Sequence, residues 1–159
     1  MSFTVQPIGV VRSTRKTVED DNWDAEQGAI ELDPACFSAE SLVGLDLFSH
    51  VAVIYLLDRV SPSKIEVAAR HPRNDPRYPK VGIFAQRGKN RPNRLGLTVC
   101  RVLGVKGLRI ELAGLDALDE TPVLDLKPWY DEYGPRGKVE EPAWVAEVMR
   151  GYWSGKTGD

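Results

Sequence analysis

The 159-residue sequence lacks a long apolar run and has few cysteines. Its longest apolar stretch, residues 51–57, stops at Asp58, whereas a membrane-spanning helix needs about 20 residues. The first residues show no charged segment followed by an apolar stretch, so we expect no signal peptide. Two cysteines, Cys36 and Cys100, do not make a disulfide framework. These features predict one soluble, cytoplasmic domain with no membrane span.

Motifs of several common enzyme classes are also missing. No G-x-G-x-x-G occurs, and residues 82–90 differ from a phosphate-binding loop in spacing and lack its Ser or Thr. His50 and His71 share no metal-ligand spacing with the cysteines. Ser49 and His50 are neighbours, so on a strand their side chains would face opposite ways and form no nucleophile–base pair. We expect a hydrogen-bonded structural role for His50 and a buried position for Cys100.

The sequence does contain short β-rich runs separated by glycine and proline. Apolar and charged residues alternate over residues 108–112, which is the pattern of a half-buried strand. A tight hairpin is expected at residues 105–107. The runs that predict strands are residues 5–12, 29–32, 50–57, 65–69, 81–86, 97–102, 108–112 and 123–126.

Two helices are expected among these strands. Ser38 can cap a short helix over residues 39–43, and a longer amphipathic helix is predicted from Glu141 to about Trp153. The apolar stripe of the longer helix could be a cofactor or partner site, although packing against the rest of the fold is the simpler interpretation. The stripe consists of Trp144, Val145, Val148, Met149, Tyr152 and Trp153.

Many short strands and one late helix favour a mainly β protein, built as a small closed or nearly closed β-barrel, over a doubly wound α/β sheet. We expect a single domain in which residues 1–139 form the barrel. Residues 140–159 would then form the C-terminal helix, packed on the barrel, and a frayed tail.

The charges are strongly segregated, although the net charge is only −2. Residues 70–94 carry eight Lys or Arg against one acid, whereas residues 111–147 carry ten acids against three bases. Residues 19–33 add seven acids and no base. Such runs are typical of solvated faces. They also fit a basic loop that meets a polyanion such as RNA, beside acidic loops that attract a cation.

Five blocks of sequence are distinctive in both content and order. They are IGVVRS (8–13), GLDLFSHV (44–51), VGIFAQR (81–87), RPNRLGL (91–97) and LDALDETPVLDLKP (115–128). Together they resemble the TsaA-like (YaeB-like) family of S-adenosylmethionine-dependent tRNA methyltransferases. The resemblance implies a β-barrel methyltransferase outside the Rossmann type, with the cofactor at or near the subunit interface of a homodimer. It also implies tRNA as substrate, with N6-methylation of threonylcarbamoyladenosine at tRNA position 37.

The resemblance further implies cofactor contacts in four places: a loop after the first strand, the end of the 50–57 strand, the 87–97 region and the turn at 116–119. These expected cofactor residues are Asp21, Asn22, Trp23, Asp58, Arg59, Arg87, Leu97, Asp116, Leu118 and Asp119. Aromatic faces such as Trp23 can stack on adenine or attract a cation. The RNA-binding candidates are Arg73, Arg77, Lys89, Arg91, Asn93 and Arg94.

No catalytic residue is assigned and no metal is expected. Methyl transfer from a sulfonium is an in-line displacement, in which positioning alone can contribute about 7–11 kcal/mol. A carboxylate near the sulfonium or the methionine ammonium would stabilise their positive charge.

The sequence departs from the family in three places. Its 20–23 loop is shorter than in longer members, Asp58-Arg59 replaces a His-Gln pair, and Arg94-Leu95 replaces a common Pro-Ile. Longer members also carry a further C-terminal domain. Two alternatives therefore stay open: a methyltransferase on another RNA or on a small molecule, and a non-catalytic regulator that binds the cofactor or RNA.

Overall fold

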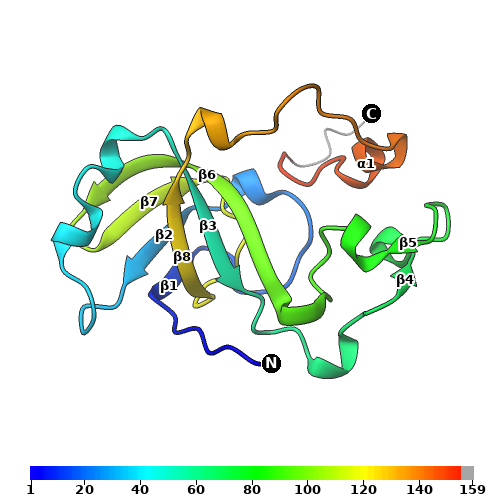
Figure 1. The fold of residues 1–159 in the computed structure, drawn as a ribbon, viewed down its shortest axis with the longest axis horizontal. Coiled ribbons are helices and arrows are strands. Elements are labelled where there is room, and N and C mark those ends of the chain that lie inside the picture. The colour runs from blue at the N-terminus through cyan, green and yellow to red at the C-terminus, as the bar shows by residue number, and fades with distance from the viewer. Residues whose placement is uncertain (155–159) are drawn as a thin grey trace.

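The computed structural model describes residues 1–154, which contain a closed barrel of antiparallel strands, on the left in Figure 1. Around the barrel the strands follow the order β1-β2-β7-β6-β3-β8. A separate two-stranded sheet pairs β4 with β5. The strands are β1 (Gly9–Ser13), β2 (Gly28–Leu32), β3 (His50–Leu56), β4 (Ala69–Arg70), β5 (Val81–Gly82), β6 (Leu95–Lys106), β7 (Arg109–Ala113) and β8 (Pro122–Pro128). The expected mainly β, closed-barrel fold is confirmed.

The helical elements among residues 1–154 are short. The α-helix α1 spans Ala143–Val148, and no helix among residues 1–154 is long and apolar enough to cross a membrane. The 3₁₀ turns are η1 (Trp23–Ala25), η2 (Ala39–Leu42), η3 (Leu45–Leu47), η4 (Pro62–Lys64), η5 (Pro72–Asn74), η6 (Ile83–Ala85), η7 (Pro92–Arg94) and η8 (Asp131–Tyr133).

The barrel interior is filled by the inward-facing residues of neighbouring strands. Val11 lies opposite Ile30, Ile30 lies opposite Ile110, and all three are fully buried. On the other side of the barrel Val51 of β3 faces Cys100 of β6. Burying each such side chain contributes roughly 1.5–3 kcal/mol relative to leaving it exposed. The alternation that predicted the strands is therefore the same pattern that forms the core.

Two predicted strands are largely wrong. Only residue 69 of the 65–69 prediction lies in β4, and the 81–86 prediction retains only Val81 and Gly82 before η6 begins. In these segments side chains take up backbone groups that a strand ladder would use: the Glu66 carboxylate accepts from the N–H groups of Val67 and Ala68, and the Gln86 amide donates to the Val81 carbonyl. The first strand begins at Gly9, beyond Pro7, rather than at residue 5, and proline supplies no backbone N–H to a strand ladder. The hairpin turn lies at residues 107–108, just after the expected position.

Both predicted helices are also shorter than expected. The segment after Ser38 is a 3₁₀ turn rather than an α-helix, although the Ser38 hydroxyl does accept from the Glu40 N–H at 3.4 Å. The predicted 141–153 helix is α-helical only over Ala143–Val148, and Gly151 then takes a left-handed conformation. Glycine adopts that conformation at little cost and commonly ends helices. Figure 1 shows α1 on the side of the molecule where β4 and β5 lie.

Candidate functional site

Three hydroxyl groups from distant parts of the chain converge on the carboxylate of Asp116. The Tyr55 hydroxyl, from β3, donates to Asp116 Oδ1 at 3.0 Å. The Thr98 hydroxyl, from β6, donates to the same oxygen, and the Tyr152 hydroxyl donates to Oδ2. A carboxylate has about four acceptor positions, so this arrangement leaves room for a further donor. Asp116, an expected cofactor residue, is therefore held in a fixed orientation at one end of the barrel.

Burial of this cluster keeps its tyrosines protonated. Tyr55 is only 4% exposed, and Gly96 on the neighbouring strand makes room for its ring, because a Cβ there would lie 2.2 Å from the ring. Burial, followed by the charge of Asp116, raises the pKa of Tyr55 and that of Tyr152 well above their usual range. Both hydroxyls consequently remain donors to the carboxylate at any physiological pH.

Cys100 lies beside this cluster but has no nucleophilic character. It is fully buried, and burial together with the nearby Asp116 charge raises the pKa of its thiol to about 12. A thiol is nucleophilic only as a thiolate. The prediction of a buried, hydrophobe-like Cys100 is confirmed.

The loop that contains Asp21, Asn22 and Trp23 is organised by Arg15. The buried Arg15 guanidinium donates to the backbone carbonyls of Asp21, at 2.7 Å, and Asn22, at 3.0 Å. It also pairs with Glu26 at 3.0 Å and lies 4.3 Å from the centre of the Trp23 ring. One face of Trp23 is thus already covered by a cation.

The indole nitrogen of Trp23 is the feature of this loop that points most directly to a ligand. Trp23 is 6% exposed, and its Nε1 is one of two buried side-chain nitrogens without a hydrogen-bond partner in the described part of the chain. A buried donor left unpaired costs about 1–3 kcal/mol. Trp23 Nε1 could therefore donate to an acceptor on a bound cofactor.

Two ion pairs connect this acidic loop to the basic segment. The Arg73 guanidinium donates to both carboxylate oxygens of Asp21, at 2.6 and 3.0 Å, and these hydrogen bonds raise the pKa of Arg73. Lys89 Nζ lies 2.7 Å from Asp20 Oδ1. Two of the RNA-binding candidates thus contact the loop that was expected to hold the cofactor.

Asp119 and Arg59 form a third connection at the same end of the barrel. The Asp119 carboxylate accepts from the Ser13 N–H at 3.0 Å, and its own N–H donates to the Arg15 carbonyl at 2.9 Å. Arg59 donates to the Asp119 carbonyl and to the Lys16 carbonyl, both at 2.8 Å. An unbroken series of contacts therefore runs from Arg59 through Asp119 and Arg15 to the 21–23 loop.

The remaining basic residues mostly bind backbone carbonyls of their own region. Arg87 donates to the carbonyl of Leu97 at 2.6 Å, which brings together two expected cofactor residues. Arg91 donates to the Gln86 carbonyl and Arg94 to the Val60 carbonyl, at 3.0 and 3.1 Å.

Other predicted residues stand apart from the cluster. Arg77 pairs with Asp75, which lowers the pKa of that carboxyl to about 2. Asp58 is exposed, and its carbonyl accepts a long hydrogen bond from Arg94, at 3.4 Å. Leu118 is half-buried in the turn between Asp116 and Asp119.

Left-handed backbone conformations are concentrated in the same segments. Six non-glycine residues among residues 1–154 have positive φ, and five of them are Asn22, Arg73, Asn74, Asn93 and Arg94. Such conformations cost of order 1–3 kcal/mol and cluster at functional sites. Their placement in the loop and in the basic segment fits a role in binding.

One exclusion made from sequence is wrong. Ser49 Oγ lies 2.8 Å from His50 Nδ1, although strand alternation predicted that the two side chains would diverge. The reason is that Ser49 precedes β3 and so does not follow its alternation. The hydrogen-bonded role expected for His50 is confirmed.

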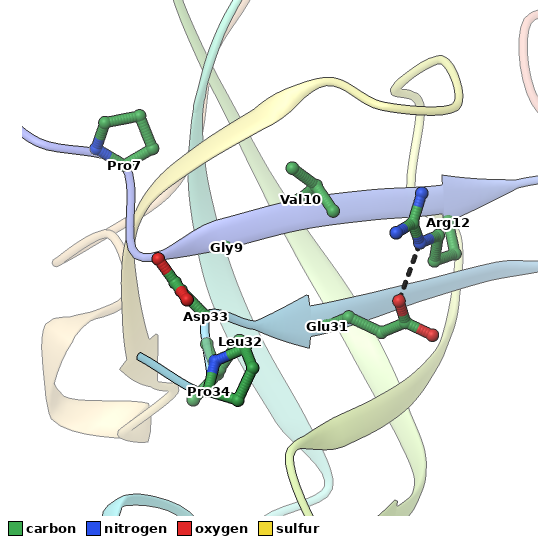
Figure 2. Close-up of a pocket in the computed structure, with 8 residues that line it drawn as sticks. All are labelled: Pro7, Gly9, Val10, Arg12, Glu31, Leu32, Asp33 and Pro34. Carbon is green, nitrogen blue, oxygen red and sulfur yellow. Dashed lines mark hydrogen bonds and ion pairs between the residues drawn. The ribbon is translucent and has the colours of Figure 1, made fainter. Parts of the chain in front are cut away.

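Two shallow grooves lie on the surface of the barrel. Figure 2 shows the first, of about 280 Å³, between the start of β1 and the end of β2, where Arg12 pairs with Glu31. Its lining contains none of the expected cofactor residues. The second, of about 330 Å³, includes Asp119 together with Ser13 and Lys16. Within residues 1–154 no group of His, Cys, Asp or Glu is arranged to hold a metal ion.

Sequence reasoning missed three residues of this site: Tyr55, Thr98 and Arg15. Thr98 and Tyr55 had a usable signal, because both are polar residues at inward-facing positions of predicted strands. Arg15 had none, because only the folded chain brings it to the 21–23 loop. Tyr152 belonged to the apolar stripe that could be a cofactor or partner site, but its contact with Asp116 had no sequence signal.

The fold is that of a small closed barrel, and the clustered carboxylate, arginine and aromatic groups form a candidate ligand site at one end of it. Residues 15–134 match the model of the tRNA-methyltransferase O N-terminal domain, so the chain belongs to this family. The TsaA-like resemblance is thereby confirmed.

The names of individual proteins similar to this chain are consistent with this family. The chain is 36% identical over 141 residues to a "Probable S-adenosyl-L-methionine-binding protein" of Methanothermobacter thermautotrophicus, covering 86% of this chain and 97% of that protein. It is 37% identical over 102 residues to the human tRNA (adenine(37)-N6)-methyltransferase, covering 64% of this chain but only 23% of the human protein. The crystal structure of TrmO from Pseudomonas aeruginosa superposes with a TM-score of 0.71 at 30% identity, covering 90% of this chain and 62% of that one. The chain thus spans less than two thirds of these last two proteins.

Proposed function

We propose that this protein is an S-adenosylmethionine-dependent methyltransferase that modifies N6 of the threonylcarbamoyladenosine at tRNA position 37. The observation that carries the proposal is the convergence of expected cofactor segments at one barrel end. The 21–23 loop, Arg59 and Asp119 are joined through Arg15. Thr98, which contacts Asp116, follows directly after Leu97 on β6. The relatives named for S-adenosylmethionine binding and for tRNA methylation support the same conclusion.

The residues present suit this cofactor. Asp116 offers a carboxylate whose described partners are neutral hydroxyls, which suits a positively charged sulfonium or ammonium. Trp23 Nε1 offers an unpaired buried donor. When bound, the cofactor supplies an electrophilic methyl group. This chain's own residues contribute binding and orientation, which are the main sources of catalysis for such a displacement.

We also propose that the working form is a homodimer, with the cofactor site at or near its subunit boundary. Four outward-facing residues of β6 form an exposed apolar stripe: Leu95 (45% exposed), Leu97 (47%), Val99 (42%) and Leu103 (61%), with the exposed Arg101 between the last two. Exposed apolar stripes of this kind mark interaction surfaces. Leu97 belongs both to the stripe and to the expected cofactor residues, so a second copy seated here would border the site. A tRNA substrate also implies a cytoplasmic location.

One observation favours the second candidate, a methyltransferase on another RNA or on a small molecule. Arg73, Lys89 and Arg77 are paired with Asp21, Asp20 and Asp75 respectively. Their charges are thus partly neutralised within the molecule, which reduces their attraction for a phosphate backbone.

Mass spectrometry of nucleosides tests both candidates. Purified protein is incubated with isotopically labelled S-adenosylmethionine and with two tRNA preparations, one carrying threonylcarbamoyladenosine at position 37 and one carrying unmodified adenosine there. We expect labelled methyl only in the modified nucleoside of the first preparation. Label in another nucleoside would support the other-RNA alternative. Cofactor binding without label in any nucleoside would favour a small-molecule acceptor or a regulator.

A further inference from the structure

The segment that follows α1 lies across two parts of the candidate cofactor site. We call residues 151–153 the C-terminal strap. Its three consecutive carbonyls, from Gly151, Tyr152 and Trp153, accept from the N–H groups of residues 22, 23 and 24 at 2.9, 3.0 and 2.8 Å. The three N–H donors lie at the N-terminal end of η1. The first N–H groups of a helical turn have no hydrogen-bond partner within that turn. Figure 1 shows the red end of the chain returning from α1 toward the blue segment that contains η1.

The strap also reaches the second part of the site, the turn that begins at Gly114. The Tyr152 hydroxyl donates to Asp116 Oδ2. Trp153 packs edge-on against Tyr152, with ring centres 5.0 Å apart and planes at 89°. A Cβ on Gly114 would lie 4.0 Å from the Trp153 ring. The strap thus bridges the 21–23 loop and the Asp116 turn, which are otherwise about 90 residues apart in the sequence.

The strap contacts determine which groups of Asp116 and of the 21–23 loop stay available to contact a ligand. Asp116 is fixed from the barrel side by Tyr55 and Thr98 and from the other side by Tyr152. The N–H groups of residues 22–24 are already satisfied by the strap. A ligand in this position would therefore meet the side chains of the loop, such as the Trp23 indole, rather than its backbone donors.

We propose that the C-terminal strap is a part of the cofactor site, and that Tyr152 is a positioning residue that orients Asp116 for S-adenosylmethionine. The inference rests on the proposed function, because it takes S-adenosylmethionine as the ligand. It adds that the affinity for the cofactor depends on a segment after α1, outside residues 15–134 that match the family model.

The test is the Tyr152→Phe variant of the full chain, which removes a single hydroxyl. The matched control is Tyr133→Phe, because Tyr133 is 81% exposed and lies on η8. Dissociation constants for S-adenosylmethionine and for its demethylated product are measured by calorimetry. Loss of a hydrogen bond to a charged group predicts a rise in the Tyr152→Phe dissociation constant of about tenfold or more, with the control unchanged.

Two further measurements separate positioning from a general structural role. In methylation assays the KM for S-adenosylmethionine should rise in Tyr152→Phe while the KM for tRNA stays unchanged. Because the lost hydrogen bond is present without ligand, the melting temperature of Tyr152→Phe should fall by several degrees, which leaves it folded at the assay temperature, while that of Tyr133→Phe stays unchanged. Trp153→Leu, which keeps an apolar side chain over Gly114, provides a second perturbation of the strap and should weaken cofactor binding in the same direction.

The possible outcomes are distinguishable. If the wild type does not bind S-adenosylmethionine, both the proposed function and this inference fail. If the wild type binds but both strap variants bind equally well, the inference alone fails and the strap is only structural. If the strap variants bind more tightly, the strap blocks the site rather than forming part of it, which also overturns the inference.

Discussion

Asp116 is held by neutral hydroxyl groups rather than by a basic side chain. Among the residues that the structure describes, its recorded side-chain partners are Tyr55, Thr98 and Tyr152. An arginine or lysine partner would cancel the carboxylate charge, whereas a hydroxyl orients the carboxylate and leaves that charge in place. A partly buried negative charge of this kind favours a cationic ligand.

Replacing Asp116 by asparagine should therefore weaken cofactor binding. Asn keeps the size of the side chain but removes the charge, and we expect Asp116→Asn to raise the dissociation constant for S-adenosylmethionine at least about tenfold. Titration calorimetry measures the effect. The control is Asp125→Asn on β8, whose carboxylate pairs with Lys127 at 3.0 Å, away from the cluster. Equal affinities for the two variants would contradict a role for Asp116 in binding.

The two cysteines should differ sharply in reactivity. Cys36 is exposed and Cys100 is buried, with a thiol pKa of about 12. A thiol reagent at pH 8 should modify one thiol per folded chain and two after denaturation. Because the folded pKa of Cys100 is raised, its contribution to stability is fully present below the ordinary thiol pKa of 9.0 and is lost as the pH rises toward 12. Modification of two thiols in the folded protein would show that the barrel opens readily.

At the scale of elements, few side chains of the 15–26 loop are buried. Its conformation is therefore held by hydrogen bonds from Arg15 and by ion pairs with the basic segment. Trp23 and Arg15 are its only fully buried residues. Exposed ion pairs contribute about 0–1 kcal/mol each. The contacts Asp21–Arg73 and Asp20–Lys89 therefore affect where the loop lies more than whether the protein folds.

The double variant Arg73→Ala, Lys89→Ala should accordingly reduce cofactor affinity. Releasing both ion pairs frees the loop that carries Trp23, and we expect the dissociation constant for S-adenosylmethionine to rise several-fold. Arg77→Ala is the control, because Arg77 pairs with Asp75 within its own segment. Calorimetry at low and high salt checks the result, since salt should weaken wild-type binding in the same direction. An unchanged affinity in the double variant would show that the loop position does not depend on these pairs.

The sequence predicted the barrel elements better than the site. Alternation located β2, β3, β7 and β8 closely, because each has one face in a shared core. Periodicity failed between residues 62 and 94, where prolines and side-chain contacts to backbone carbonyls set the conformation. Asp116 could be singled out from a motif. Tyr55 and Thr98 had a signal as polar residues at inward-facing strand positions. Their contact with Asp116 and Tyr152 had none, since these residues meet only after the barrel has closed and the chain end has returned to it.

For the whole molecule, some charges of the acidic segment are paired with charges of the basic segment. Acidic residues 20 and 21 contact basic residues 89 and 73, so the acidic and basic segments are neighbours in the fold. The attraction of the basic segment for a polyanion is consequently smaller than its composition indicates. Arg87 and Lys80 of the basic segment are exposed. Arg87 donates to the carbonyl of Leu97, a residue of the apolar β6 stripe, so the stripe borders the basic segment.

The last prediction concerns assembly through this stripe. A charged side chain in an apolar contact between two copies must lose water without gaining a partner, so Val99→Arg, Leu103→Arg should disrupt the proposed homodimer. In sedimentation experiments at micromolar concentration we expect a dimeric wild type and a monomeric double variant. Because Leu97 borders the cofactor residues, the monomer should also bind S-adenosylmethionine more weakly. The control is Val67→Arg, Val139→Arg, which adds the same two charges at positions outside β6 that are 76% and 65% exposed, and it should remain dimeric. Circular dichroism verifies that the barrel is intact in each variant, since both β6 positions face outward. A wild type that sediments as a monomer while methylating its substrate would show that one copy suffices and that the β6 stripe has another role.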